Sequence, residues 1–341
     1  MKNIKLGLLG LGTVGSGVLQ MVQQNADKIL DVTGCKLTVK TALVRNLGNY
    51  NKYADETSLT TDFDEILNDD EIKIVVELMG GIHPAKEYIT TLLKNHKNVV
   101  TANKDLIASY GPELMTVAHE NHCDLMFEAS VAGGIPILRT IANSFTADKV
   151  TEVKGIVNGT TNYILTQMSQ RGWSYHQALA QAQQLGFAES DPTNDVTGKD
   201  AAYKMIILSQ FAFGTQLDIK DIAVEGIDRL NDADVQQAAS FGPVLIPRDH
   251  PLATINNEFN AVMVTAQAVG DTLFYGRGAG GLPTANSVLS DITTVTKNII
   301  LGTNGNLFNN YQQPYIPAKL ADIKYPYYLS LTLPDVPGQL L

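Results

Sequence analysis

The amino-acid sequence predicts an α/β fold on three observations. Residues 4–24 read as a buried strand, a glycine-rich turn and a helix. Segments typical of strands and helices then alternate to about residue 127, the pattern of a parallel sheet covered by helices. The composition changes after about residue 133, and a second glycine-dense turn at 275–281 precedes another helix. We therefore expect a Rossmann domain formed by residues 1–132 and 282–310, with an inserted mixed α/β domain at 133–281.

The first glycine-rich turn has the spacing of a dinucleotide-binding site. In this motif the first glycine makes the turn, and the second lets a pyrophosphate approach the backbone. The third lets helix and strand pack closely, with the phosphates at the helix N-terminus. A purely structural turn is the alternative, but the flanking strand and helix favour cofactor binding. The residues that we expect to contact the cofactor here are Gly10, Gly12, Thr13, Val14 and Gly15.

The second predicted strand, at 36–45, ends in an arginine. Proteins specific for NAD usually have an acid at this place, which binds the ribose 2′-hydroxyl. This chain has Arg45 followed by Asn46. Because a guanidinium suits a 2′-phosphate, the sequence favours NADP(H), with NAD(H) as the second choice. An exposed arginine without a ligand is the structural alternative.

Three more strands are predicted in the first domain, at 72–78, 98–102 and 124–127, with helices at 84–93 and around 112–121 between them. Lys104 lies just beyond the strand at 98–102, on the side where open α/β sheets bind their ligands. We expect it to act in the site, the alternative being a solvated loop lysine. Glu128 follows the last strand and precedes a loop of small residues at 129–136. Carbonyl groups of such a loop can bind a hard cation, although an interdomain hinge explains it equally well.

The inserted domain is predicted to have strands at 149–157, 221–226 and 258–269 and helices at 163–170 and 175–185. The strand at 258–269 is apolar on both faces, so we expect it in an isologous dimer sheet. The helix at 163–170 is preceded by Asn158-Gly159-Thr160-Thr161-Asn162, whose short donors suit a substrate carboxylate or a helix cap. A last helix at 283–300 could return to the first domain and close over the cofactor.

The densest group of charges lies in Gly186–Lys204, directly before an apolar helix. If Thr197 caps that helix, Asp200 and Lys204 are one turn apart on its first turns. Charges at the start of a core helix would form the floor of a cavity. The alternative is a capped loop with an ordinary surface ion pair. The carboxylates of this segment are Glu189, Asp191, Asp195 and Asp200, and its lysines are Lys199 and Lys204.

Composition excludes several classes of partner. The 341 residues are 44% hydrophobic and 18% charged, with a net charge of −10 and no block rich in lysine or arginine. These values argue for a globular protein and against nucleic acid or an anionic membrane as its partner. Two cysteines fit a reducing cytosol. No run of 18 apolar residues occurs, so we expect no membrane span and a cytoplasmic location.

Six stretches, in their expected order, resemble homoserine dehydrogenases. They are GLLGLGTVGSGV near the start, VTANKDLIA (100–108), FEASVAGGIPI (127–137), GIVNGTTNYIL (155–165), GFAESDPTNDVTGKDAAYK (186–204) and FYGRGAGGLPTA (274–285). The family reversibly reduces L-aspartate 4-semialdehyde to L-homoserine with NAD(P)H, in the biosynthesis of threonine, methionine and isoleucine. The resemblance implies the same fold, the same reaction and a homodimer.

The resemblance also implies roles for single residues. Lys204 corresponds to the acid/base lysine, and Lys104 to a second lysine between nicotinamide and substrate. Carboxylates that bind the substrate ammonium and order the lysines correspond to Glu189, Asp195 and Asp200. Residues that line the substrate pocket correspond to Thr160 and Phe187. Further cofactor contacts are expected at Gly186, Gly280 and Gly281, and a structural sodium site at Glu128, Val131, Gly133 and Ile135.

Two features depart from the family pattern. The family usually has Gly-Pro-Gly or a similar triplet after a tyrosine, whereas this chain has Arg277 at the centre of that triplet. The stretch at 327–341 resembles the first strand and turn of an ACT regulatory domain, so we expect residues 311–341 to be a linker and the beginning of a truncated domain of that kind. Threonine feedback through it does not follow from the sequence.

Other functions fit the residues less well. An oxidoreductase acting on a neutral sugar has no need of the carboxylate cluster. A semialdehyde dehydrogenase that forms a thioester needs a nucleophilic cysteine, and Cys123 lies at the start of a predicted buried strand. A non-catalytic dinucleotide sensor with the same fold has no need of Lys204 and its neighbouring acids.

Overall fold

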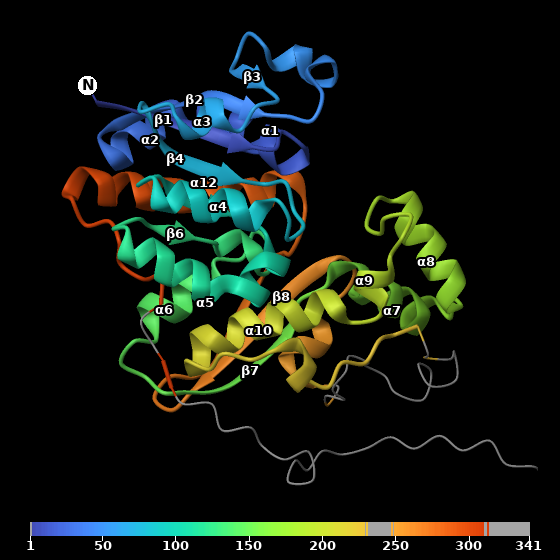
Figure 1. Cartoon of the computed structure of the whole chain (residues 1–341). Helices are drawn as coiled ribbons and strands as arrows, with labels where there is room; N and C mark the ends of the chain where they lie inside the picture. The colour runs from blue at the N-terminus through green and yellow to red at the C-terminus, as the bar shows by residue number, and fades with distance from the viewer. Residues whose placement is uncertain (1, 229, 231–246, 248, 310–311, 314–341) are drawn as a thin grey trace, which may run out of the picture.

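The computed structural model describes residues 2–228, 230, 247, 249–309 and 312–313. Its first part is a six-stranded parallel sheet with the strand order β3-β2-β1-β4-β5-β6 (Figure 1). The strands are β1 (Lys2–Leu9), β2 (Cys35–Leu43), β3 (Ser58–Thr60), β4 (Ile72–Glu77), β5 (Asn98–Thr101) and β6 (Leu125–Met126). This order is that of a Rossmann sheet, whose direction of winding reverses between β1 and β4.

Helices cover both faces of the parallel sheet. One face packs against α1 (Thr13–Gln24), α2 (Ala26–Thr33) and α12 (Gly281–Leu301), and the other against α3 (Asp64–Leu67), α4 (Ala85–Lys94) and α5 (Lys104–Glu120). The second half of β1 shows why its sequence is apolar from Leu6 to Leu9. Leu6 and Leu8 belong to the core beneath α1, whereas Leu9 belongs to the core beneath α4. A strand buried on both faces needs a continuous apolar run.

The second part of the chain holds an antiparallel sheet in the order β7-β8-β9, formed by Val150–Ile156, Phe259–Ala266 and Gly270–Arg277. Its helices are α6 (Ile137–Ser144), α7 (Gly159–Arg171), α8 (Tyr175–Gln184), α9 (Thr193–Val196) and α10 (Lys199–Phe213). Short 3₁₀ helices occur at Leu47–Tyr53, Glu128–Ser130, Ile219–Asp221 and Pro251–Thr254. Figure 1 shows α10 beside α5, where the two parts of the chain meet.

Strand β8 is buried on both faces by its own chain. Val262 and Val264 join the core formed with α6 and α10, whereas Met263 packs in a smaller cluster with Leu252. The two-sided apolar pattern that led us to expect a dimer sheet is therefore explained within one chain. The neighbouring strand β9 keeps Tyr275 exposed on the face that carries Met263.

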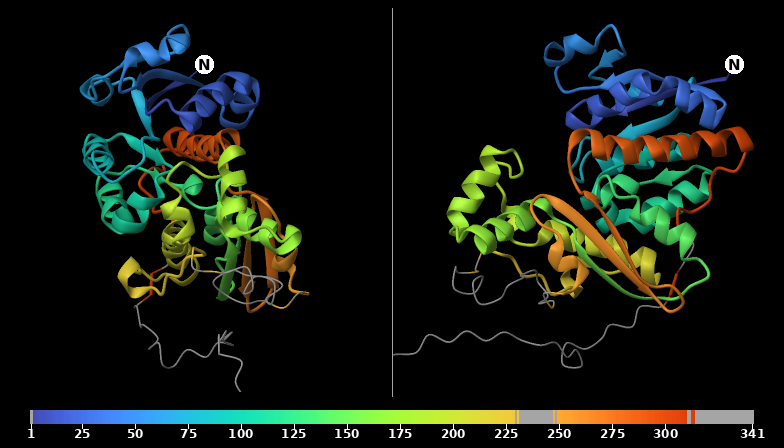
Figure 2. Two further views of the ribbon diagram at one scale, coloured as in Figure 1. Left: turned by 90° about the vertical axis from the view of Figure 1, so that its right-hand side faces the viewer. Right: turned by 180° about the vertical axis from the view of Figure 1, so that it is seen from behind.

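The chain passes between the two parts at two adjacent glycine-rich segments. The backbone N–H of Gly134 donates to the carbonyl of Arg277 at 3.0 Å. A Cβ atom on Gly133 would lie 2.4 Å from the carbonyl oxygen of Gly278, so this close approach requires glycine. After the second segment, α12 returns to lie along α1 (Figure 2). Ala285 and Val288 of α12 lie in the same core as Leu6 and Leu8 of β1.

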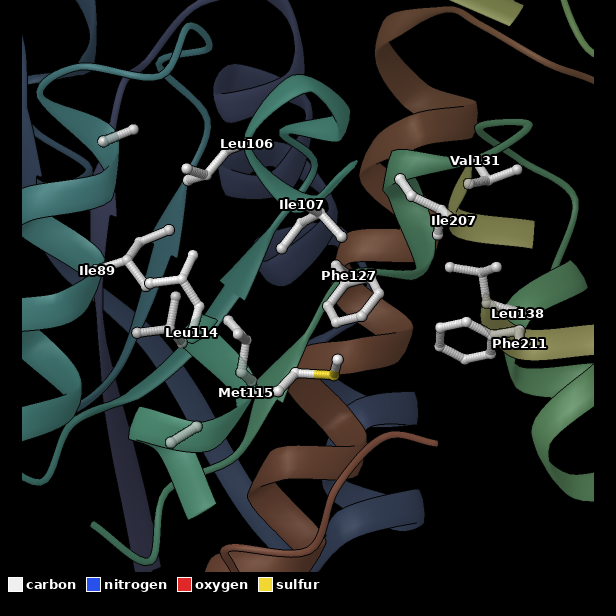
Figure 3. Close-up of a cluster of buried hydrophobic side chains, with 14 of the residues drawn as sticks. Ile89, Leu106, Ile107, Leu114, Met115, Phe127, Val131, Leu138, Ile207 and Phe211 are labelled. Carbon is white, nitrogen blue, oxygen red and sulfur yellow. The ribbon is translucent and has the colours of Figure 1, made fainter. Parts of the chain in front are cut away.

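A single hydrophobic cluster joins the two parts (Figure 3). Phe127, which follows β6, is fully buried at its centre and meets the rings of Phe211 on α10 and Phe308 edge-on. Ile107 of α5 and Leu138 of α6 pack in the same cluster. Rings that meet edge-on stabilise beyond the area that they bury. The position of α10 relative to α5 is therefore set by a packed core.

The expected fold class is confirmed, and so are most of the predicted elements. The helix expected around 112–121 begins earlier, at Lys104, because the side chain of Asn103 caps it by accepting a hydrogen bond from the N–H of Leu106 at 3.2 Å. Pro112 lies inside this helix instead of at its start. The tail at 327–341 lies outside the described residues.

Two local predictions are wrong. Thr197 does not cap α10, because its hydroxyl donates back to the carbonyl of Thr193 at 2.7 Å and Gly198 occupies the N-cap position. Gly198 has a φ of 83°, and a Cβ there would lie 2.7 Å from the carbonyl of Glu225. The strand expected at 221–226 is absent from these residues, which form the end of a 3₁₀ turn and irregular chain.

We predict that Phe127→Ala destabilises the protein by about 3–5 kcal/mol, because it removes a fully buried ring and leaves a cavity. Urea denaturation followed by fluorescence measures the change. The control is Val269→Ala, at a side chain that is 61% exposed and should change stability by less than about 0.5 kcal/mol. An equal loss in both variants would contradict the role assigned to this cluster.

Candidate active site

The glycine turn after β1 has the geometry that phosphate binding needs. Gly10 has a φ of 102°, and a Cβ on Gly15 would lie 2.3 Å from the carbonyl oxygen of Gly10. A Cβ on Gly12 would meet no atom within 4 Å, so open space lies in front of this residue. The first turn of α1 has no side-chain cap. Its backbone N–H groups are therefore directed at the open space, as an anion at a helix N-terminus requires.

Two other segments border this turn. The N–H of Gly10 donates to the carbonyl of Leu43 at 3.0 Å, which brings the end of β2 to the glycine turn. Arg45, two residues further on, is exposed and forms no ion pair with any other described residue. Gly281, at the start of α12, packs against Thr13, where a Cβ would lie 3.2 Å from the carbonyl oxygen of Thr13. The segments predicted to contact a cofactor, 10–15, Arg45 and 280–281, thus come together.

A cluster of two lysines and one aspartate lies at the junction of α5 and α10. Lys104 is the first residue of α5, directly after the carboxyl end of β5, and its Nζ lies 3.2 Å from Oδ1 of Asp200 on α10. Lys204, one turn further along α10, donates from Nζ to Oδ2 of Asp200 at 2.7 Å and to the carbonyl of Val157 at 2.7 Å. Asp200 is buried, and its two carboxylate oxygens each face one of the two ammonium groups.

Asn158, the residue before α7, connects this cluster to a second carboxylate. Its Nδ2 donates to Asp195 at 2.7 Å and to Asp200 at 2.8 Å. Its Oδ1 accepts from the N–H of Thr161 at 2.8 Å and so caps α7. The sequence marked Asn158 only as one of several donors near a helix start. Its part in the carboxylate cluster depends on the fold, which brings the beginnings of α7, α9 and α10 together.

The charges in the cluster alter each other's titration. Burial alone would raise the pKa of Asp200, but Lys204 and Lys104 outweigh it and the pKa is lowered. Burial lowers the pKa of Lys104, and the carboxylates of Asp200 and Asp105 reverse that effect so that the pKa is raised. The pKa of Asp195 is raised by burial and, to a smaller extent, by the charge of Asp200. An ammonium kept charged beside the open edge of the sheet can donate a proton to a ligand oxygen.

The residues expected to line the substrate pocket are only partly brought to this cluster. The hydroxyl of Thr160, on the first turn of α7, donates to the carbonyl of Phe187 at 2.6 Å. Gly186 precedes Phe187 with a φ of 75°. Glu189 is exposed and contacts neither lysine, and its carbonyl accepts from Gln183 Nε2 at 3.1 Å. The structure therefore places Thr160 beside Phe187 and leaves Glu189 outside the cluster.

The predicted sodium site lies where the chain first passes between the two parts. The carboxylate of Glu128 accepts from the N–H groups of Leu138 at 2.9 Å and Arg139 at 2.7 Å, so its charge is directed at the start of α6. The carbonyl of Gly133 accepts from the hydroxyl of Ser287 at 2.6 Å, and that of Ile135 from a backbone N–H. Each carbonyl oxygen has a second lone pair. A cation here would therefore be bound by the backbone carbonyl oxygens, because both oxygens of the Glu128 side chain already accept from the start of α6.

Next to Glu128, a second buried carboxylate shares the same arginine. The guanidinium of Arg139 pairs with Asp291 of α12, whose Oδ2 accepts from the N–H of Glu128 at 2.8 Å. Burial raises the pKa of Glu128, and it raises the pKa of Asp291 to about 7. No group of three or more histidine, cysteine, aspartate or glutamate side chains suited to a metal occurs in the described ranges.

The candidate site spans two segments that match known families of domains. Residues 10–128 match the family described as the NAD-binding domain of homoserine dehydrogenase, and residues 136–293 match the family described as homoserine dehydrogenase. The chain is 44% identical to the homoserine dehydrogenase of Bacillus subtilis, over 99% of this chain and 83% of that protein. It is 46% identical to the enzyme of Lactococcus lactis, over 99% of this chain and 85% of that protein.

Solved structures give the same result. The homoserine dehydrogenase of Thiobacillus denitrificans superposes with a TM-score of 0.85 at 38% identity, covering 96% of this chain and 79% of that one. A homoserine dehydrogenase mutant from a hyperthermophilic archaeon, solved in complex with NADPH, superposes with a TM-score of 0.74 at 26% identity, covering 86% of this chain and 98% of that one. No helix in the part of the chain that the structure describes is long and apolar enough to cross a membrane.

The raised pKa of Asp291 predicts a pH dependence of stability. Between the ordinary pKa of aspartate and about 7, the folded protein holds a proton that the unfolded chain has released, so stability falls as pH rises through this window. Asp291→Asn removes the titration. We expect the variant to gain stability relative to wild type between about pH 5 and about pH 8, measured as melting temperature.

The control for this measurement is Asp31→Asn, at an exposed aspartate on α2. The difference in melting temperature between Asp31→Asn and wild type should be independent of pH in the same window. A difference between Asp291→Asn and wild type that does not change with pH would show that Asp291 is ionised throughout.

Proposed function

Because the chain belongs to the homoserine dehydrogenase family, we propose that it reversibly reduces L-aspartate 4-semialdehyde to L-homoserine with NAD(P)H. The observation that supports this most is the position of the Lys104–Asp200–Lys204 cluster. It lies at the carboxyl end of β5, on the edge of the sheet that carries the glycine turn. Ligands of open α/β sheets bind at this edge.

The nicotinamide gives or takes the hydride when it is bound, and the residues of the chain supply the proton and the positioning of the reacting groups. In the proposed mechanism, the Lys204 ammonium donates a proton to the aldehyde oxygen during reduction and accepts it during oxidation. Lys104 contributes a second positive charge toward the same oxygen. Asp200 holds both ammonium groups in place, and its charge helps to raise the pKa of Lys104.

The two ends of the amino-acid substrate need separate groups. We propose that Asp195 binds the α-ammonium, because one of its oxygens accepts from Asn158 and the other has no partner among the described residues. The beginning of α7, with Thr160, is the proposed site of the α-carboxylate, since N–H groups and the helix dipole favour an anion there. Phe187 and Glu189 remain proposed pocket residues.

For the cofactor we propose a preference for NADP(H). Arg45 is exposed beside the glycine turn without an ion-pair partner among the described residues, as a group that binds a 2′-phosphate should be. The archaeal relative named above was solved with NADPH. NAD(H) is the alternative. Further proposed contacts are Gly10, Gly12, Thr13, Val14, Gly15, Lys104, Gly186, Gly280 and Gly281.

The remaining proposals concern assembly, domains and a bound ion. We propose a homodimer that forms through the face of the antiparallel sheet on which Leu273 and Tyr275 are exposed. We also propose a role in the biosynthesis of threonine, methionine and isoleucine, and a cytoplasmic location. The proposed division is 1–132 with 282–310, and 133–281. Na⁺ is proposed as a structural ion held by the carbonyls of Val131, Gly133 and Ile135, with Glu128 supplying negative charge nearby.

We predict that Lys204→Met lowers kcat for L-homoserine oxidation at least about 100-fold, because general acid–base groups contribute by that amount or more. Binding of NADPH, followed by its fluorescence, should not change. Lys199→Met is the control, since Lys199 is exposed at the first position of the same helix. Full activity in Lys204→Met would contradict the acid/base role. Absence of activity in wild type with either cofactor would contradict the proposed reaction.

Arg45→Ala should weaken binding of NADPH at least about tenfold, because a charged hydrogen bond to the 2′-phosphate is lost. Binding of NADH, which has no such phosphate, should change less than about twofold. Arg171→Ala is the matched control, because Arg171 is exposed at the far end of α7. Equal weakening for both cofactors would contradict a phosphate-specific role, and fluorescence titration distinguishes the outcomes.

A further inference from the structure

Glu77, the last residue of β4, is a fully buried carboxylate with no cation among its bonded partners. One oxygen accepts from the N–H groups of Met79 at 2.8 Å and Gly80 at 3.2 Å, and the other accepts from the hydroxyl of Thr101 at 2.7 Å. An ionised carboxylate is costly to bury and needs several donors to remain there. All three donors come from the segments that follow or end β4 and β5.

The hydrogen bonds continue from Thr101 to the start of α5. The Thr101 hydroxyl, which donates to Glu77, accepts from the N–H of Asn103 at 3.0 Å. The side chain of Asn103 donates to the carbonyl of Gly81 at 2.6 Å and accepts from the N–H of Leu106 at 3.2 Å. The bonds therefore form a closed ring, from Glu77 through the end of β5 to the cap of α5 and back through the loop after β4.

This ring of hydrogen bonds fixes the position of Lys104. It follows Asn103 as the first residue of α5, and from there its Nζ reaches Asp200 across the junction between the two parts of the chain. The other side of the ring borders the glycine turn, where a Cβ on Gly10 would lie 3.0 Å from the carbonyl of Leu78. A shift of the helix start by even a fraction of an ångström would change the Lys104–Asp200 contact.

We propose that Glu77 and Thr101 are positioning residues for Lys104, which they hold in place through Asn103 and the first turn of α5. This inference rests on the role proposed for Lys104. Asp124, which directly precedes β6 at the amino end of the same sheet, is a buried carboxylate for comparison, to which we assign a purely structural role. Asp124 is equally buried and its carboxylate accepts from Asn298, Asn304 and the N–H of Gly305, but none of these bonds reaches the first turn of α5, which carries Lys104.

The test uses Thr101→Val, which keeps the shape of the side chain and removes the hydroxyl that links Glu77 to Asn103. We expect kcat for L-homoserine oxidation to fall about tenfold while KM changes less than about twofold, because the orientation of a reacting group is lost and not a substrate contact. Thr101→Ser, which restores the hydroxyl, should recover kcat to within about twofold of wild type.

A second readout does not depend on activity. Competitive labelling of the ligand-free protein with acetic anhydride, followed by peptide mass spectrometry, gives the reactivity of each lysine. A looser contact with Asp200 lowers the pKa of Lys104 and leaves more of its amine unprotonated, so Thr101→Val should raise labelling of Lys104 at least about threefold. Labelling of Lys97, which directly precedes the amino end of β5, should not change.

Asp124→Asn is the matched control and Glu77→Gln the second test variant. We expect Asp124→Asn to lower the melting temperature without altering kcat or the labelling of Lys104, and Glu77→Gln to reproduce both effects of Thr101→Val. Unchanged labelling of Lys104 in Thr101→Val and in Glu77→Gln would overturn the inference. So would an equal increase in Asp124→Asn. If Lys104 becomes more reactive while kcat is unchanged, the positioning stands and the catalytic role proposed for Lys104 fails.

Discussion

The structure depends on one buried carboxylate that is shared between two lysines. Asp200 accepts from Lys204 on its own helix and lies within ion-pair distance of Lys104 on α5, which belongs to the parallel-sheet part. Burying one carboxylate against one ammonium often gives little net stability, because both lose their hydration. Here the carboxylate also accepts from Asn158 and lies in the first turn of α10, where the helix dipole favours negative charge. These contributions keep the charged form of Asp200 in place.

Such a cluster requires that the parallel-sheet part and the part that carries α10 are held in a fixed position relative to each other. The hydrophobic cluster around Phe127 provides this, because residues of α5, α6 and α10 belong to it and Phe211 of α10 meets the Phe127 ring. The two chain crossings at 133–134 and 277–278 are hydrogen-bonded to each other and approach so closely that glycine is needed. Packed cores resist continuous deformation. The distance between Lys104 and Asp200 is therefore fixed by apolar packing as much as by charge.

Sequence reasoning found the features that are local and missed those that depend on tertiary contacts. The strand–turn–helix around Gly10 and the residues Lys104, Asp200 and Lys204 could be found because each follows a recognisable pattern in the chain. Asn158 as a shared donor could not, since Asp195 and Asp200 are distant from it in sequence. Thr197 was predicted as a cap because its residue type suits one, but only the contact between Gly198 and Glu225 shows that a left-handed glycine takes that place. The ring through Glu77 and Thr101 gives no sequence signal beyond a polar residue at each strand end.

The buried carboxylates of the described chain differ in what neutralises them, and that difference explains their roles. Glu77 and Asp124 accept only from neutral groups and hold segments together, and Asp291 shares one arginine with Glu128. Asp200 alone among these has two cations, and Asp195 beside it has a raised pKa and only one bonded oxygen. An incoming ammonium would lower the pKa of Asp195, because a nearby positive charge favours the ionised form. The two lysines would then be directed at a substrate oxygen on which negative charge develops during reduction. The arrangement thus separates the binding of a substrate ammonium, at Asp195, from the transfer of a proton, at Lys204.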